Sequence, residues 1–142
     1  MALQVVFRTD ASLTIGTGHV MRCLTLANAL VGKGAEVSFI CREHEGHLCD
    51  LIEEQGFAVH RLHAPTENFT IEAIPAHAAW LGAAWQEDAD QTSAVIKTLG
   101  IKPDWLVVDH YALDSRWEHA LRPLVGRIFV IDDIADRTHD CD

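Results

Sequence analysis

The chain has 142 residues, of which 49% are hydrophobic and 23% charged, and its formal net charge is -10 at pH 7. This length and composition predict one globular domain with a sizeable core rather than a disordered chain. The acidic balance argues against a general partner of nucleic acid or anionic membranes, and neither a membrane-spanning run nor a secretory leader is recognisable, so we expect a cytoplasmic protein with no nucleic-acid or membrane partner.

Short apolar runs alternate with longer amphipathic ones, which is the pattern of βαβ units in a parallel sheet. Strands are predicted at residues 3–8, 36–41, 57–62, 105–109 and 127–131. Helices are predicted at residues 18–31, 47–55, 85–99 and 115–121, and Ser115 and Glu118 have the spacing of a capping box at the start of the last helix. We therefore predict an α/β, Rossmann-like domain: a parallel sheet of about five to six strands with helices on both faces.

The loop between the first predicted strand and helix is the most informative segment. Gly16 and Gly18, on either side of Thr17, let the backbone turn sharply and approach a ligand, and the free N–H groups of a helix start attract anions. His19 follows with a ring that can titrate near neutral pH. Ligands of open α/β sheets bind at the carboxyl ends of strands, so His19 is a candidate catalytic base; its alternative role is to cap the helix start.

Two further loops are expected at the same edge of the sheet, after the fourth and fifth strands. They contain Asp109, His110, Tyr111, Asp132 and Asp133. These side chains either line a ligand cleft or only cap the turns that follow each strand. Asp10, after the first strand, either orients an imidazole or binds a sugar hydroxyl, or else accepts backbone N–H bonds within its loop.

Known phosphate-binding motifs do not account for the glycine loop. A Walker sequence and a serine-hydrolase elbow are both missing, and the third glycine of a dinucleotide fingerprint falls on Met21. A nicotinamide-binding oxidoreductase is therefore disfavoured, and we expect no cofactor.

Four potential zinc ligands lie close together in the sequence, at Cys41, His44, His47 and Cys49. Their spacing does not match the usual zinc pairs, so we favour a buried strand end, a polar loop and a packed helix start, with reduced thiols and no metal.

Two segments depart from the regular alternation of strands and helices. Residues 63–84 are longer than one connection needs and contain two prolines and Trp80, which favours a functional flap. Residues 132–142 follow a strand without forming a further element, so we expect the domain to be part of a longer protein.

Three motifs of the chain resemble one enzyme family. They are Arg8-x-Asp10 with Ile15-Gly16-Thr17-Gly18-His19-x-x-Arg22, then Pro103-Asp104-Trp105-Leu106-Val107-Val108-Asp109-His110-Tyr111, then Ile131-Asp132-Asp133-Ile134-Ala135-Asp136-Arg137-x-His139-x-Cys141-Asp142. On these motifs the chain resembles the UDP-sugar hydrolases of pseudaminic acid biosynthesis, which are similar to MurG-like glycosyltransferases of the GT-B class. The resemblance runs through essentially all 142 residues.

The resemblance implies that residues 1–142 form the N-terminal half of a GT-B fold. In this family the UDP portion is bound mainly by a C-terminal Rossmann-like domain, which this sequence does not include. That domain and the UDP-sugar substrate are therefore the expected partners, and the isolated half is expected to be inactive.

The implied reaction is hydrolysis of UDP-2,4-diacetamido-2,4,6-trideoxy-β-L-altropyranose to UDP and the free sugar, with His19 acting on water. UDP is a good leaving group, so one base that activates water can suffice. Two alternatives stay open: the acceptor domain of a MurG-like glycosyltransferase, and a non-catalytic binding half-domain. Residues expected to bind substrate by their match to the motifs are Asp10, Gly16, Thr17, Gly18, Arg22, His110, Tyr111 and Asp133.

Overall fold

A computed structural model describes residues 2–65 and 78–142, and it contains one five-stranded sheet. All neighbouring strands pair in parallel, in the order β3-β2-β1-β4-β5. The strands are β1 (Gln4–Thr9), β2 (Glu36–Arg42), β3 (Ala58–Leu62), β4 (Trp105–Asp109) and β5 (Arg127–Val130). The predicted α/β, Rossmann-like class is confirmed.

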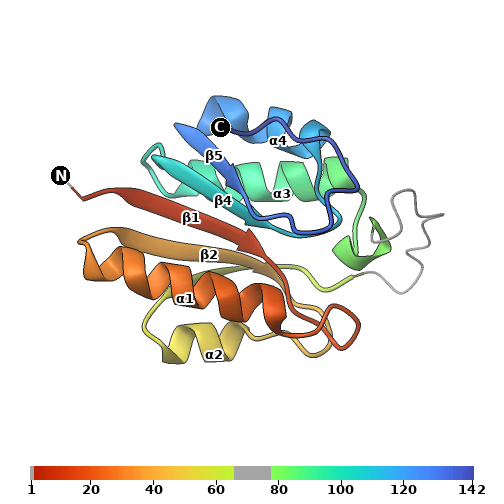
Figure 1. Ribbon diagram of the computed structural model, residues 1–142, viewed down its shortest axis with the longest axis horizontal. Helices are drawn as coiled ribbons and strands as arrows, with labels where there is room; N and C mark the ends of the chain where they lie inside the picture. Colours follow the sequence, from red (N-terminus) through yellow and green to blue (C-terminus); the bar gives the residue numbers. More distant parts are fainter. Residues whose placement is uncertain (1, 66–77) are drawn as a thin grey trace.

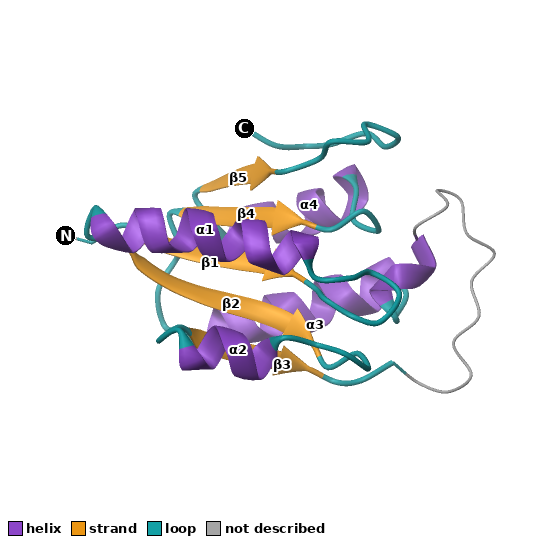
Figure 2. Cartoon of the chain, turned by 60° about the horizontal axis from the view of Figure 1, so that its bottom comes forward, coloured by secondary structure: helices purple, strands orange, loops and turns teal. Residues whose placement is uncertain are grey.

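Helices cover both faces of the sheet, as Figures 1 and 2 show: α1 and α2 lie on one face, and α3 and α4 on the other. They are α1 (Gly18–Gly32), α2 (Cys49–Glu54), α3 (Trp85–Thr98) and α4 (Ser115–Leu121), with short 3-10 turns η1 (Ala78–Leu81) and η2 (Arg122–Leu124). The predicted strands and helices begin and end within about two residues of these bounds, the usual uncertainty of element ends.

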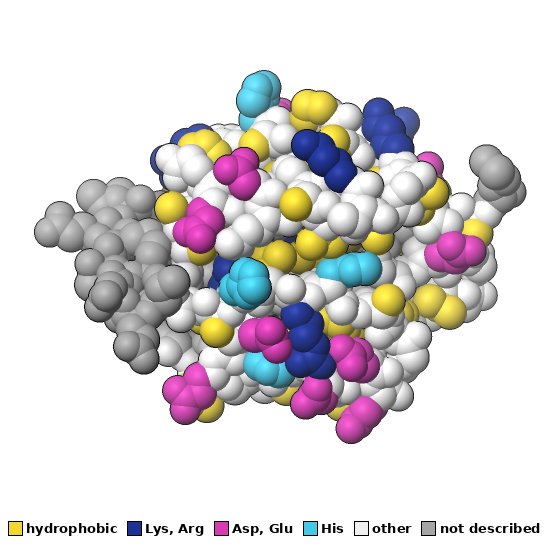
Figure 3. All heavy atoms as spheres, turned by 180° about the vertical axis from the view of Figure 1, so that it is seen from behind, with side chains coloured by type: hydrophobic (Ala, Val, Ile, Leu, Met, Phe, Trp, Pro, Cys, Tyr) yellow, Lys and Arg dark blue, Asp and Glu magenta, His cyan; other side chains and the backbone are white. Residues whose placement is uncertain are grey.

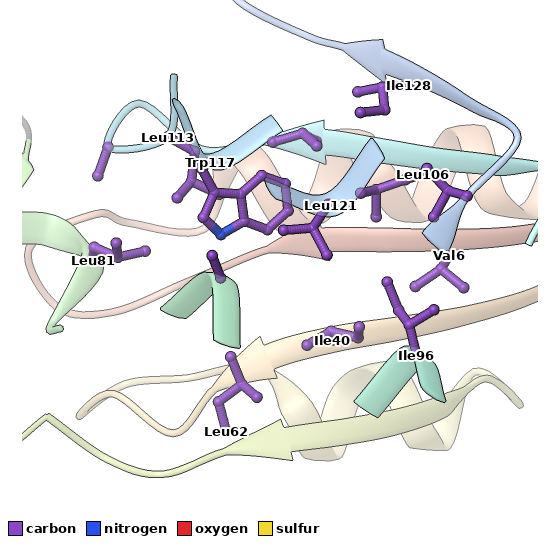
Figure 4. Close-up of a cluster of buried hydrophobic side chains, with 14 residues drawn as sticks. Val6, Ile40, Leu62, Leu81, Ile96, Leu106, Leu113, Trp117, Leu121 and Ile128 are labelled. Carbon is purple, nitrogen blue, oxygen red and sulfur yellow. The ribbon is translucent and has the colours of Figure 1, made fainter. Parts of the chain in front are cut away.

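The core has two layers because the central strands are buried on both faces, as expected for a parallel sheet. Side chains alternate along β1, so Val6 points to one face while Val5 and Phe7 point to the other. Figure 4 shows the layer beneath α3 and α4, where Val6 and the fully buried Trp117 contribute to one apolar cluster. In the second layer Phe7 stacks on Phe39 of β2, with ring centroids 4.9 Å apart.

The capping box predicted for the last helix is wrong. Asp114 is the N-cap residue of α4, and its carboxylate accepts the backbone N–H of Arg116 at 3.0 Å. Ser115 is therefore the first helical residue, which moves Glu118 one position too far along the helix for the reciprocal bond. The buried Glu118 carboxylate instead accepts bonds from the segment that follows β5.

An apolar hollow of about 190 Å³ lies between α1 and the adjacent side of β4 and β5. Its lining residues are Leu3, Val5, Leu26, Leu30, Trp105, Val107 and Phe129. None of these side chains can titrate or bind a metal, so the polar chemistry of the domain lies elsewhere.

The surface in Figure 3 does not present a basic patch. On this face Lys and Arg side chains lie among acidic and uncharged ones. Across residues 2–65 and 78–142, none of the helices combines the length and the apolar character needed to cross a bilayer.

Candidate functional site

The candidate site lies at the carboxyl ends of β1 and β4, where the strand order changes direction. The chain runs from β1 outward to β2 and β3, and β4 then pairs with the other side of β1. Ligands of open α/β sheets bind at such a switch point, in the crevice outside the carboxyl ends of the strands. A narrow pocket at this point is lined by Asp10, Ile15, His19, Trp80, Asp109, His110 and Tyr111.

The loop from β1 to α1 is shaped by hydrogen bonds within the loop itself. The Ser12 carbonyl accepts the N–H of Gly16 at 2.8 Å, and the Ser12 hydroxyl accepts the N–H of Ile15 at 2.8 Å. Gly16 has a φ of +80°, a left-handed conformation that favours glycine. Thr17 and Gly18 are exposed at the start of α1, and a Cβ on Gly18 would meet no atom within 4 Å. The helix start is thus open to a ligand.

His19 forms a buried pair with Asp109, the last residue of β4. The Nδ1 atom of His19 lies 2.6 Å from Oδ1 of Asp109. An ionised carboxylate only accepts hydrogen bonds, so the neutral ring carries its proton on Nδ1 and its lone pair on Nε2. A 3.3 Å contact from Arg22 to Nδ1 is too long to compete with that bond. Within the described part of the chain nothing donates to Nε2, so this nitrogen can accept a proton.

Arg22 connects this pair to the loop after β5. Its guanidinium donates through Nε to one oxygen of Asp109 and through a terminal nitrogen to the other at 2.6 Å. A second terminal nitrogen lies 3.4 Å from Asp133, which also accepts the hydroxyl of Tyr111. Side chains from α1, β4 and two loops therefore converge on His19.

The electrostatics keep Asp109 ionised. Its burial would by itself raise the pKa of Asp109, but hydrogen bonds from Arg22 and His19 outweigh the burial and hold this pKa below its usual range. The Asp109 carboxylate is therefore a stable acceptor for the His19 Nδ1–H. It can also balance the charge of a His19 imidazolium.

Asp10 lies beneath the pair, and its carboxylate is saturated with donors. Arg8 donates to both oxygens at 2.7 and 3.1 Å, and the backbone N–H of Arg42 donates at 2.7 Å. Nε2 of His44 and of His110 lie 3.1 and 2.9 Å from Oδ2. Although burial would raise the pKa of Asp10, the Arg8 charge and the histidine bonds hold it well below its usual range. We infer that Asp10 orients the two rings rather than a ligand.

Asp10, His44 and His110 place three potential metal-ligand atoms within 4.8 Å of one another. The backbone N–H of Ala112 donates to Nδ1 of His110 at 3.1 Å, so this ring carries its proton on Nε2. Burial lowers the pKa of His110 more than Asp10 raises it, which favours that neutral form. A metal would need the Nε2 lone pair, so the residues fit a hydrogen-bonded network better than a metal site.

The zinc grouping weighed from the sequence is not formed. His44 turns to Asp10, while Nδ1 of His47 accepts the backbone N–H of Cys49 at 3.2 Å. Cys41 and Cys49 are free, buried thiols.

An aromatic wall borders the pair. The ring of Tyr111 meets the His19 ring edge to face at 4.4 Å, and Trp80 stacks on Tyr111 at 6.0 Å. Trp80 belongs to the segment predicted as a flap, of which residues 66–77 lie outside the described residues. Its described end thus reaches the pocket and gives it an apolar side.

The structure brings most of the predicted site residues together. His19 and Arg22 both bond to Asp109, and Tyr111 and Asp133 contact them. Asp10 and His110 form a second bonded pair at the same pocket. Gly16, Thr17 and Gly18 form the adjoining loop. Sequence reasoning missed the pairing of Asp109 with His19, although Asp109 ends β4 and His19 follows the neighbouring parallel strand β1. It also did not assign Trp80 to the site.

No protein-family model matches this chain, and no curated protein is significantly similar to it.

Proposed function

We propose that this domain supplies the catalytic base of an enzyme that hydrolyses a UDP-linked diacetamido-trideoxy sugar. The observation that carries the proposal is the His19–Asp109 pair at the switch point between β1 and β4. A histidine whose Nδ1–H is fixed by a buried carboxylate is a suitable general base, because its second nitrogen is available for proton transfer.

In the proposed reaction, His19 Nε2 takes a proton from water as the water oxygen bonds to the anomeric carbon. The bond from that carbon to the phosphate oxygen breaks, and UDP leaves with the electron pair. UDP needs little protonation to depart, so one base can suffice. Asp109 then faces an imidazolium and stabilises its charge.

Other residues of the site have supporting roles in this proposal. The helix start at the exposed Thr17 and Gly18 can donate backbone N–H groups to an oxygen of the substrate. The Tyr111 and Trp80 rings offer an apolar surface to a sugar that lacks one hydroxyl. Arg22 keeps Asp109 ionised and oriented. Most contacts to UDP would come from a second domain, since a pocket this narrow cannot hold a whole nucleotide sugar.

The test uses a protein that joins this domain to its nucleotide-binding partner, with the UDP-sugar as substrate. His19→Gln is expected to lower turnover by about 10²- to 10⁴-fold, the usual contribution of general base catalysis, without unfolding the domain. His119→Ala is the matched control, because this histidine is exposed on α4 away from the pocket. Oxygen-18 from labelled water should appear in the released sugar.

Near-normal turnover of His19→Gln would refute the proposal, as would oxygen-18 in the UDP. Sugar release that requires an added alcohol and yields a glycoside would show a glycosyltransferase instead.

A further inference from the structure

Side-chain bonds tie the segment after β5 back to the domain. In Figure 1 this dark-blue segment runs from the end of β5 to the C-terminus without helix or strand. His139 lies toward the end of this segment: its Nδ1 atom is 2.7 Å from Glu118 of α4, and its Nε2 atom is 2.7 Å from Asp132 near the start of the segment. The imidazole therefore bridges two carboxylates.

This geometry selects the protonation state of His139. Both ring nitrogens face acceptor oxygens, and only the imidazolium has an N–H on each nitrogen. A neutral ring would point one lone pair at a carboxylate. The Glu118 side chain is fully buried and that of Asp132 nearly so, which strengthens the attraction. The Arg137 guanidinium, 3.4 Å from Asp132, opposes the attraction, because its positive charge by itself lowers the pKa of His139. The backbone N–H of Asp140 donates to Glu118 at 2.6 Å.

The bridge bears directly on the candidate site through the residue next to Asp132. The Asp132 carboxylate also accepts the backbone N–H groups of Ile134 and Ala135, both at 3.2 Å, which fixes the turn. Within this turn lies Asp133, whose largely exposed carboxylate reaches Arg22 and Tyr111. Asp133 itself is not buried, so its place depends on the turn that carries it.

We propose that His139 is a positioning residue, which as an imidazolium ties Asp132 to Glu118 and so holds Asp133 against Arg22 and Tyr111 beside His19. The inference rests on the proposed function for the catalytic consequence alone. The structural consequence is that protonation of His139 holds the segment after β5 against α4, and this is independent of the reaction.

The bridge responds to pH in a defined direction. Burial would lower the pKa of His139, but the bonds from its ring to Asp132 and Glu118 outweigh the burial and raise this pKa above the ordinary histidine value. A raised pKa in the closed state stabilises that state fully below the ordinary value, and the stabilisation is lost as the pH rises through the raised pKa. The loop should therefore open as the pH rises above the ordinary histidine range.

The first experiment measures amide hydrogen exchange of the 142-residue chain by NMR, without substrate, at several pH values between about 6 and 9. After correction for intrinsic exchange, the Ala135 and Asp140 amides should lose about tenfold protection for each unit by which the His139 pKa is raised, over the range in which the ring deprotonates. Amides of β1 should keep their protection. His139→Gln should remove the pH dependence, whereas His60→Gln, at a half-buried histidine of β3, should retain it.

The second experiment follows the pH profile of sugar release in the two-domain protein. His139→Gln is expected to lose an alkaline limb that the wild type shows at the pKa found by NMR. Uniform protection of Ala135 and Asp140 across the pH range in the wild-type chain would overturn the inference, and this result needs no variant. If the Ala135 and Asp140 amides exchange in a pH-dependent way but the two-domain protein releases no sugar, the proposed function is refuted and the inference about the loop stands.

Discussion

A buried charge network beneath the site gives the most direct test of the fold energetics. It consists of Arg8, Asp10, Arg42 and Asp88, whose side chains are at most 2% exposed. Asp88 of α3 accepts a terminal nitrogen of Arg8 at 2.6 Å and one of Arg42 at 2.7 Å, and it also accepts Nε1 of Trp117 at 2.9 Å. The two positive and two negative charges balance only while both carboxylates are present.

Asp88→Asn removes one charge without creating a cavity, since the two side chains have the same shape. The arginines then keep an uncompensated positive charge in the interior. Breaking a buried ion pair in this way costs about 3–5 kcal/mol of unfolding free energy. For a domain of this length, about 3 °C of melting temperature corresponds to 1 kcal/mol, so we expect Tm to fall by about 10–15 °C.

The assay is urea unfolding of the 142-residue chain, with Tm from calorimetry. The midpoint should fall while the slope m stays unchanged, because the surface exposed on unfolding is the same. Asp90→Asn, at an exposed position of the same helix, is the matched control and should lie within about 0.5 kcal/mol of the wild type. A loss below about 1 kcal/mol for Asp88→Asn would refute the argument that the network needs both carboxylates.

Three further predictions follow from the same structure. Asp109→Asn should move the proton of the neutral His19 ring from Nδ1 toward Nε2, which nitrogen-15 chemical shifts of the ring would show. Turnover should then fall by about 10⁴-fold, because the wrong tautomer is present. An unchanged tautomer would contradict the assignment. Gly82→Ala should destabilise the domain by about 1–3 kcal/mol in urea, because its φ is +74° and a Cβ would lie 2.9 Å from the His44 ring; wild-type stability would show that the loop adapts. Folding lowers the pKa values of Asp10 and Asp88. The two carboxylates therefore stabilise the folded state above about pH 4, and this stabilisation is lost as the pH falls below that value. Acid titration of Asp88→Asn should show a shallower loss of stability than acid titration of the wild type.

The fold could be predicted because its signals are local. The runs that became β1 and β4 are short and apolar, and a parallel strand buried on both faces needs such a run. A helix start is harder to place from the sequence where two adjacent residues can both cap it. Asp114 and Ser115 are such a pair. A capping box at Ser115 would need the Glu118 carboxylate to bond back to the helix start, but Glu118 instead accepts the backbone N–H of Asp140 in the segment after β5.

The site could be predicted only in outline, because its pairings are tertiary. The carboxyl ends of strands brought the right loops together, yet His19 and Asp109 are separated by 90 positions in the chain. No local pattern shows which acid meets which histidine. The same holds for Asp10, whose role follows from donors on β1, β2 and the loop after β4.

The site contains two histidine–aspartate pairs, His19–Asp109 and His110–Asp10, and their surroundings decide which histidine can act as a base. His110 donates Nε2–H to Asp10 and accepts the N–H of Ala112 on Nδ1, so both ring nitrogens are occupied. His19 donates one N–H to Asp109, and among residues 2–65 and 78–142 no donor is bonded to its other nitrogen, which can therefore take a proton. Neighbouring carboxylates acquire different tasks in the same way: Asp10 holds a fixed network, while Asp109 can stabilise a charge that forms during a reaction. This difference is the reason for proposing His19, and not His110, as the base, while the His110–Asp10 pair is bonded on both ring nitrogens.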